Sequence, residues 1–278
     1  MVTDYRMRLR FWGVRGSIPT PQAENIEFGG NTACVEIRLL TGEVLIFDGG
    51  TGIRDLGLLL AREHPDQNLD LNLFLTHFHW DHIQGIPFFT PLYSPRNRVV
   101  FHGHGASGHP EKMLVGQMQA PYFPVALEIV AARKEFVMVD GSTRLTFGAA
   151  ELRSFPLNHP QGAVGYRIET DGAVIVYATD LEHGHAELDQ VLLEYARGAD
   201  VLIYDAQFTP EEYERHKGWG HSTWLEATRV AGKCGVGQLV LFHHDPGHDS
   251  KRIREIVAEA QRHFPATVAG REGWILHL

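Results

Sequence analysis

The hydrophobic positions of this chain fall into short runs, many rich in valine, isoleucine and leucine, that polar and glycine-containing segments separate. Nine runs have the length and residue types of β-strands: MRLRFWG, TACVEIRLL, EVLIFD, LNLFLT, RVVFHG, AVGYRIET, AVIVYATD, DVLIYDA and QLVLFHH. Several are almost continuously apolar, which is typical of strands buried on both faces. The pattern predicts a protein built largely on β-sheet.

Four segments between these runs have helical features, at residues 53–63, 185–197, 222–234 and 250–264. In the third, Thr223 and Glu226 fit a capping box, and Gly235 follows as a C-terminal stop. Strands and helices therefore alternate in both halves of the chain, which predicts an α/β fold of stacked layers. The stretch 107–130 fits neither pattern, and we expect its PYFP sequence to form a loop near the functional site.

Ionisable residues stand at the ends of four apolar runs. LNLFLT leads into His77, AVIVYAT into Asp180, DVLIY into Asp205 and QLVLF into His243. A buried strand that ends in such a residue has to satisfy it at the rim of the sheet. Two isolated histidines, His159 in NHP and His221 in GWGHST, add to the set. Ligands tend to bind at this edge of α/β sheets, so we expect these polar groups to gather there.

The segment THFHWDH, residues 76–82, carries three histidines and an aspartate directly after a predicted strand. His77 and His79 are two positions apart on an extended segment, so both side chains can face the same side. Asp81 and His82 follow after a turn and can serve a second position nearby. This arrangement favours two neighbouring metal ions. Imidazole and carboxylate ligands suit zinc, manganese or iron.

With this H-x-H-x-D-H motif the sequence resembles the metallo-β-lactamase superfamily, whose later motifs follow in order along nearly the whole chain. The resemblance implies an αββα sandwich of two similar halves, as one domain over residues 1–278. It also implies two divalent metal ions, with zinc favoured and manganese or iron as alternatives. The matching ligand positions are His77, His79 and His159 for the first ion, Asp81, His82 and His243 for the second, and Asp180 as the bridging carboxylate. For the last ligand, the adjacent His244 is an alternative to His243.

Further matches narrow the resemblance to one branch of the superfamily. FWGVRGSIPTP, GGNTACVEI, LIFDGGTGIRDLG, YDAQF and GHST are similar to motifs shared by ribonuclease Z and the phosphoribosyl cyclic phosphate phosphodiesterases. In that branch a histidine of the last motif is catalytic and an upstream carboxylate orients it. His221 and Asp205 stand at those positions, and Asp81 joins them as a catalytic residue. Because a helix N-terminus disfavours imidazolium and Asp205 favours it, we expect His221 to have a pKa near neutral pH and to transfer protons.

The charge of the chain bears on its substrate. The 278 residues include 34 acidic and 25 basic side chains, which gives a net charge of −9. The sequence has no basic stripe of the kind that binds a long nucleic acid. Ribonuclease Z enzymes usually carry a tRNA-gripping arm between their third and fourth metal motifs, but His159 and Asp180 are only 21 positions apart. We therefore predict a phosphodiesterase that acts on a small or cyclic phosphate ester through a hydroxide shared by the two ions.

Two other hydrolase classes remain as alternatives: an RNA endonuclease similar to ribonuclease Z, and a lactonase or thioesterase on the same metal frame. No apolar run approaches the about 20 residues of a membrane helix. The start MVTDYRMRLRFWG has no signal-peptide core, so we expect a cytoplasmic protein without membrane contact. The resemblance also allows a homodimer.

Several residues keep two interpretations. Asp48 in LIFDGG either orients a metal-bound histidine or caps the turn at the glycines that follow. Arg15 and Ser17 could reach a phosphate, but we expect them to be exposed to solvent. Trp219 stands two residues before His221, and we expect it in the core, with a wall for a base or sugar as the alternative.

Overall fold

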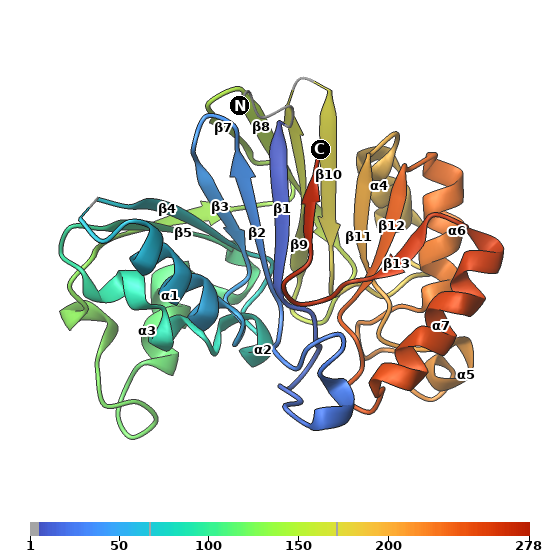
Figure 1. The fold of residues 1–278 in the computed structure, drawn as a ribbon, viewed down its shortest axis with the longest axis horizontal. Helices are drawn as coiled ribbons and strands as arrows, with labels where there is room; N and C mark the ends of the chain where they lie inside the picture. Colours follow the sequence, from blue (N-terminus) through green and yellow to red (C-terminus); the bar gives the residue numbers. More distant parts are fainter. Residues whose placement is uncertain (1–5, 67, 171) are drawn as a thin grey trace.

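Two mixed β-sheets stack face to face in the computed structural model, which describes residues 6–66, 68–170 and 172–278 (Figure 1). The described strands of the first sheet are, in spatial order, β14 (Ile275–His277), β1 (Met7–Gly13), β2 (Cys34–Leu39), β3 (Val44–Phe47), β4 (Asp70–Leu75), β5 (Arg98–His104) and β6 (Arg133–Val139). Those of the second are β13 (Thr267–Ala269), β12 (Gln238–Phe242), β11 (Val201–Asp205), β10 (Ala173–Ala178), β9 (Ala163–Thr170), β8 (Ala150–Leu157) and β7 (Arg144–Phe147). Each sheet is antiparallel in one part and parallel in the other, so the two halves are similar, as predicted.

Helices lie on the outer side of each sheet and complete the four layers (Figure 1). The helices of the first half are α1 (Ile53–Glu63), α2 (Trp80–Ile83) and α3 (Pro110–Gln117). Those of the second half are α4 (Ala186–Ala196), α5 (Pro210–Tyr213), α6 (Trp224–Cys234) and α7 (Ser250–His263). Short 3-10 turns are η1 (Ala23–Asn25), η2 (Ile86–Phe88), η3 (Thr90–Tyr93), η4 (Gly105–Ser107) and η5 (Leu127–Ile129). Within the described ranges, no helix has the length and apolar character needed to cross a membrane.

The helix predictions agree closely with these bounds, and the capping residues explain why. The Thr223 side chain accepts a hydrogen bond from the backbone N–H of Glu226 at 3.1 Å, which starts α6. Gly235 ends the helix with a φ of 63°, a left-handed conformation that suits glycine. A complete capping box lies elsewhere, at Thr209 and Glu212, where α5 begins.

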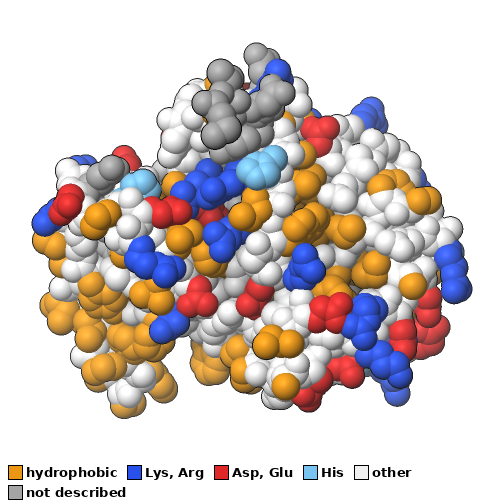
Figure 2. Space-filling view, in the orientation of Figure 1, with side chains coloured by type: hydrophobic (Ala, Val, Ile, Leu, Met, Phe, Trp, Pro, Cys, Tyr) orange, Lys and Arg blue, Asp and Glu red, His pale blue; other side chains and the backbone are white. Residues whose placement is uncertain are grey.

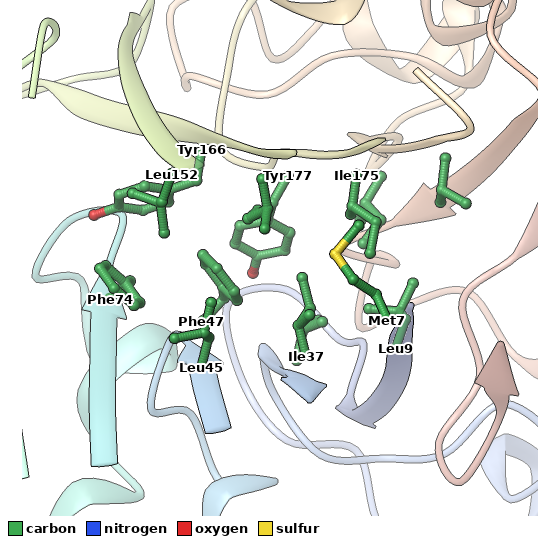
Figure 3. Close-up of a cluster of buried hydrophobic side chains, with 14 of the residues drawn as sticks. Met7, Leu9, Ile37, Leu45, Phe47, Phe74, Leu152, Tyr166, Ile175 and Tyr177 are labelled. Atoms are coloured by element: carbon green, nitrogen blue, oxygen red, sulfur yellow. The ribbon is translucent and has the colours of Figure 1, made fainter. Parts of the chain in front are cut away.

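The main core lies between the two sheets, where apolar side chains of both inner faces meet (Figure 3). Phe47 on β3 is fully buried, and its ring centroid lies 5.3 Å from that of Phe74 and 5.5 Å from that of Tyr166. Tyr177 on β10 packs on the same ring, and its hydroxyl donates a hydrogen bond to Asp48 at 2.9 Å. Because Asp48 directly follows β3, this core residue fixes a carboxylate at the end of the strand. Truncating a buried phenylalanine such as Phe47 costs about 3–5 kcal/mol.

Five strands were not predicted from the apolar runs. β6, β7 and β8 mix charged and apolar residues, and many side chains of β6 and β7 are half-buried or exposed, so no continuous apolar run reveals them. β13 and β14 are three residues long, too short for a periodic pattern. β14 pairs with β1, so the first sheet contains segments from both ends of the described chain. This pairing supports our proposal of one domain over residues 1–278.

The stretch 107–130 contains α3 and η5, with a loop at the PYFP sequence as predicted. Phe123 of this loop packs edge-on against Phe88, at 5.7 Å between ring centroids, and Tyr122 is exposed. Figure 2 shows hydrophobic side chains gathered at the lower left of this face, on the side of the molecule where α3 lies. The proximity of this loop to the functional site stays a prediction.

Candidate active site

Residues that follow strand ends of both sheets converge on one edge of the sandwich, beside α2 (Figure 1). Their potential ligand atoms form two groups that share no residue, and within each group all atoms lie within 4.8 Å of one another. The first group is His77, His79 and His159, and the second is Asp81, His82, Asp180 and His243. A third set of the same kind, Asp180, Asp205, His221 and His243, overlaps the second. The structure thus brings together all seven residues that the sequence predicts as ligands.

Asp180 connects the two groups. Its Oδ1 lies 3.8 Å from Nε2 of His77, and its Oδ2 lies 3.1 Å from Nε2 of His82. The same carboxylate is 3.4 Å from Nε2 of His243. In the first group, Nε2 of His159 and Nδ1 of His79 are 3.2 Å apart. A carboxylate between two sets of imidazoles is the position that the resemblance gave to a bridging ligand.

A fixed partner holds the outer nitrogen of each first-group ring, so that the other nitrogen points inward. Nδ1 of His159 donates to the carbonyl oxygen of Gly220 at 2.8 Å, and Nε2 of His79 lies 2.9 Å from Oε1 of Gln161. Nδ1 of His77 lies 3.0 Å from the hydroxyl of the preceding threonine. Such partners fix the orientation and tautomer of ligand histidines in metal sites.

The second group has the same construction. Nδ1 of His82 lies 2.9 Å from Oδ2 of Asp48, and Nδ1 of His243 lies 2.9 Å from Oε1 of Gln207. Both Nε2 atoms therefore face the interior, where they are 3.3 Å apart. Asp48 thus takes the first of its two interpretations, contacting a histidine of the cluster. Gln207 was not predicted, although it stands two residues after Asp205 in the YDAQF motif.

The chemistry of this donor set fits cations. Nε2 of His77 is buried and has no hydrogen-bond partner among the described residues, which is costly unless another group, such as an ion, satisfies it. Burial lowers the pKa of His77 well below its ordinary value and that of His159 to about 4, so both rings are neutral and offer lone pairs. Burial opposes charge on His82 as well, but Asp180 and Asp81 raise its pKa well above the ordinary value. The second group therefore demands positive charge.

His221 lies beside these groups but has its own partner. Its Nδ1 lies 2.8 Å from Oδ2 of the fully buried Asp205, and 4.0 Å from Oδ1 of Asp180. Burial lowers the pKa of His221, yet the negative charge and hydrogen bond of Asp205, helped by Asp180 and Asp81, raise it to about 9. We expected a pKa near neutral for His221. With the protein groups alone the pKa is higher, because three carboxylates act on the ring.

The backbone is strained where three of these side chains leave their strands. Asp48, Asp180 and His243 have φ values of 60°, 58° and 60°, in the left-handed region that non-glycine residues seldom adopt. Each costs of order 1–3 kcal/mol and persists only where the surroundings fix it, as they often do at functional sites. The strain falls on His243 and not on His244, whose Nε2 instead faces the carbonyl oxygen of Gly270 at 3.0 Å. Only His243 of this pair lies in a cluster of the described residues.

A cavity of about 440 Å³ opens onto the two groups and is lined by Ser17, Phe78, His79, Trp80, Asp81, Asp180 and His221. Ser17 is exposed as expected, and its backbone N–H donates to Oδ2 of Asp81 at 2.7 Å. Arg15 was expected in solvent but is fully buried, because its guanidinium donates to the carbonyl oxygens of Gly29 and His248. Trp219 was expected in the core, but its side chain is 61% exposed.

Solved structures identify the class of fold. The metallo-β-lactamase fold protein YhfI from Bacillus subtilis superposes with a TM-score of 0.73 at 19% identity, over 99% of this chain and 100% of that protein. A diphosphatase from the PhnP family superposes with a TM-score of 0.69 at 20% identity, over 98% of each chain. The fold is therefore that of the metallo-β-lactamases, as the H-x-H-x-D-H motif predicted.

Sequence comparison then gives the family. A ribonuclease Z from Bradyrhizobium sp. (strain ORS 278) is 30% identical over 268 residues, which take in 81% of this chain and 87% of that enzyme. The model of the Beta-lactamase superfamily domain matches residues 44–244. The chain belongs to the β-lactamase superfamily, and the predictions of this superfamily and of a hydrolase are confirmed.

Proposed function

We propose that this protein is a dinuclear metal-dependent phosphodiesterase that hydrolyses a small or cyclic phosphate ester. The observation that carries the proposal is the position of a hydrogen-bonded pair, His221 and Asp205, beside the two ligand groups, with His221 lining the same cavity as His79, Asp81 and Asp180. Hydrolases that act on carbonyl compounds on this frame, such as lactonases, do not need that donor. A phosphodiester does, because an alkoxide leaves poorly without a proton.

The proposed ligands follow the two groups. His77, His79 and His159 would hold one ion, while a second would be held by Asp81, His82 and His243, with Asp180 touching both. No cysteine belongs to either group among the described residues, so the donors suit zinc first, and manganese or iron as alternatives. Bound divalent ions supply a nucleophile at neutral pH and neutralise charge on a phosphate.

His221 is the proposed proton donor to the leaving oxygen. Asp205 holds its Nδ1, which leaves Nε2 as the nitrogen available to a substrate in the cavity. Backbone N–H groups of Asp180, Gln207 and Ser222 donate to Asp205, so its carboxylate is fixed from several sides. Cations bound to Asp180 and Asp81 would offset the two more distant negative charges and bring the pKa of His221 down toward neutral. The ring would then both hold and release a proton near pH 7.

Cleavage of RNA is the second candidate, favoured by the 30% identity to the Bradyrhizobium ribonuclease Z. Two features of this chain favour a smaller substrate. The described residues between His159 and Asp180 form β9 and β10 with short links, and no arm extends from them. The alignment is 268 positions long, but 81% of this 278-residue chain is fewer residues than that. Some stretches of that enzyme are therefore aligned with gaps in this chain.

The test is metal analysis followed by a substrate panel with the purified protein. The panel contains bis-p-nitrophenyl phosphate, cyclic nucleotides, cyclic ribose phosphates, a lactone, a thioester and a precursor tRNA. We expect two divalent ions per chain and hydrolysis of phosphodiesters that a chelator abolishes and added zinc restores. Hydrolysis of the lactone or thioester alone would overturn the proposal, as would cleavage of the precursor tRNA without activity on any small diester.

A further inference from the structure

Two tryptophans are strongly exposed, and both lie beside the candidate active site. Trp80 is 79% exposed and Trp219 is 61% exposed, whereas Trp12 and Trp224 are 8% and 6% exposed. An exposed indole keeps a large apolar surface in water, although burying that surface would be favourable. Such surface at the rim of a polar cavity suggests contact with a ligand.

Trp80 is held in place by its neighbours in the sequence. It directly follows His79 and directly precedes Asp81, one residue from each of the two ligand groups. It is also the first residue of α2, and it lines the cavity together with His221. Because both neighbours belong to the clusters, the backbone of Trp80 stays at the opening of the cavity.

Trp219 lies in a loop that hydrogen bonds to Glu182 anchor. The backbone N–H groups on either side of it, at Gly218 and Gly220, donate to the carboxylate of Glu182 at 2.8 Å and 3.0 Å. Both glycines have positive φ values, 84° and 87°, so the loop takes a turn that other residues resist. The His216 ring packs edge-on against the indole, at 4.8 Å between ring centroids. The loop thus holds one part of the indole against the protein and leaves the rest in solvent.

Both tryptophans are adjacent to the first ligand group. Trp80 follows His79, and Trp219 precedes Gly220, whose carbonyl oxygen accepts the hydrogen bond from Nδ1 of His159. The two histidines approach each other to 3.2 Å. Each tryptophan thus stands one residue from a member of this group or from its hydrogen-bond partner, so a phosphate bound there would have exposed aromatic surface nearby.

We propose that Trp80 and Trp219 form an aromatic rim, a subsite that stacks on a nucleobase carried by the phosphodiester substrate. The inference rests on the proposed function and names the substrate class as nucleotide-like. Every nucleobase has a π-face, and stacking on an aromatic side chain adds affinity without a basic surface. This matches a chain with a net charge of −9, in which the metal site rather than a basic groove would hold the phosphate.

The test compares two product-like phosphates that differ in the base, AMP and ribose 5-phosphate. Binding to the metal-loaded protein is measured by equilibrium dialysis, which requires no turnover. We expect AMP to bind about tenfold more tightly. Trp80→Ala and Trp219→Ala should each remove much of this difference and leave the affinity for ribose 5-phosphate unchanged.

Matched variants separate stacking from other effects. Trp80→Phe should keep the preference for AMP, and Trp80→Leu, which is apolar without a π-face, should lose it. Tyr93→Ala is the control, because Tyr93 is also an exposed aromatic residue, at 44%, but lines a different cavity. Metal content is measured for each variant, and Trp219→Ala gives the answer should a change at Trp80 disturb the ligands beside it. An equal affinity for AMP and ribose 5-phosphate in the unaltered protein overturns the rim.

A kinetic arm separates failure of the rim from failure of the proposed function. Thymidine 5′-p-nitrophenyl phosphate and methyl p-nitrophenyl phosphate share a leaving group, and only the first carries a nucleoside. Hydrolysis of both with equal kcat/KM and no preference for AMP would overturn the rim and leave the phosphodiesterase. Tryptophan-dependent binding of AMP without hydrolysis of any diester would overturn the phosphodiesterase and support the rim. Displacement of AMP by the dinucleotide ApA assigns the base to a small nucleotide, and displacement by precursor tRNA alone assigns it to RNA.

Discussion

The backbone N–H of Gly220 donates a hydrogen bond to Oε2 of Glu182 at 3.0 Å, and this contact joins two parts of the candidate site. The carbonyl oxygen of Gly220 accepts from Nδ1 of His159, and His221 is the next residue. A Cβ atom at position 220 would lie 2.4 Å from Nδ1 of His159, so only glycine fits at this position. One carboxylate outside the two ligand groups thus fixes a loop that orients both a proposed ligand and the proposed proton donor.

We expect Glu182→Ala to lower the affinity for the first metal ion and to slow turnover, while the protein stays folded. The substitution removes the acceptor of the Gly218 and Gly220 N–H groups, so the loop no longer holds His159 in one orientation. Loss of such an outer contact typically weakens metal affinity about 10–100-fold. Competition with a chromophoric chelator measures the affinity of each ion directly.

Glu194→Ala is the matched control for this prediction, because Glu194 is an exposed residue of α4 whose contact is with Gln190. It should leave metal affinity and kcat as they are. Glu182→Gln keeps one acceptor oxygen and should fall between the two. An alanine variant at Glu182 that binds both ions normally would show that the loop holds its shape without the carboxylate.

The second prediction concerns His221. We expect His221→Ala to keep its metal content and to lose about 10²–10⁴-fold in kcat on diesters with alkoxide leaving groups. The loss should be much smaller for p-nitrophenyl esters, since that leaving group departs without a proton. Asp205→Asn should lower the pKa of His221 and move the descending limb of the kcat–pH profile to lower pH, because the carboxylate is the main group that raises that pKa. Loss of an ion from His221→Ala would instead make this histidine a ligand.

The sequence predicted the site where the signal was local. The strands before His77, Asp180 and His243 are mostly apolar runs, so the ionisable residue after each could be recognised and its position at the sheet rim followed. Glu182 and Gln207 were missed because they act through a loop backbone or the outer nitrogen of a ring. Their partners are distant in the chain, and no spacing records such contacts.

The errors have physical causes as well. Trp219 was expected in the core because tryptophan is usually buried there, but the glycines beside it and the carboxylate of Glu182 hold it at the surface. Arg15 was expected in solvent because a guanidinium is costly to bury, but backbone carbonyl oxygens of two distant loops accept from it. In both cases long-range contacts override the preference of the residue type.

The third prediction separates the two adjacent histidines after β12. His243→Ala should reduce the metal content from two ions to one per chain, since its Nε2 lies 3.1 Å from Asp81 and 3.4 Å from Asp180 in the second group. His244→Gln is the matched control and should retain both ions, because the His244 ring faces Gly270. Inductively coupled plasma mass spectrometry after gel filtration measures both variants. Retention of two ions by the His243 variant would remove this residue from the proposed ligands.

The last prediction concerns acid stability and uses a histidine outside the clusters. His102 on β5 is 4% exposed, and its ring stacks on Phe74 at 4.3 Å between centroids. Burial, with a smaller contribution from the positive charge of Arg98, lowers its pKa to about 4. The unfolded chain binds this proton near pH 6.5, so protonation favours unfolding below that value. The folded protein should therefore lose about 3 kcal/mol as the pH falls from 6.5 to 4, and nothing from this group above pH 6.5.

Urea unfolding of the chelator-treated protein between pH 7.5 and 4 tests this contribution without release of metal ions as the pH falls, and the ligand histidines titrate alike in the unaltered protein and in the variants compared with it. His102→Phe keeps the stack on Phe74 and removes the titrating group, so its free energy of unfolding should depend less steeply on pH in the acid range. His109→Phe, on an exposed residue, should follow the unaltered protein. An equal pH dependence of the free energy of unfolding in His102→Phe and the unaltered protein would mean that His102 has the same pKa in the folded and the unfolded chain. That result would contradict the proposed effect of burial, because a buried imidazole cannot gain charge without that penalty.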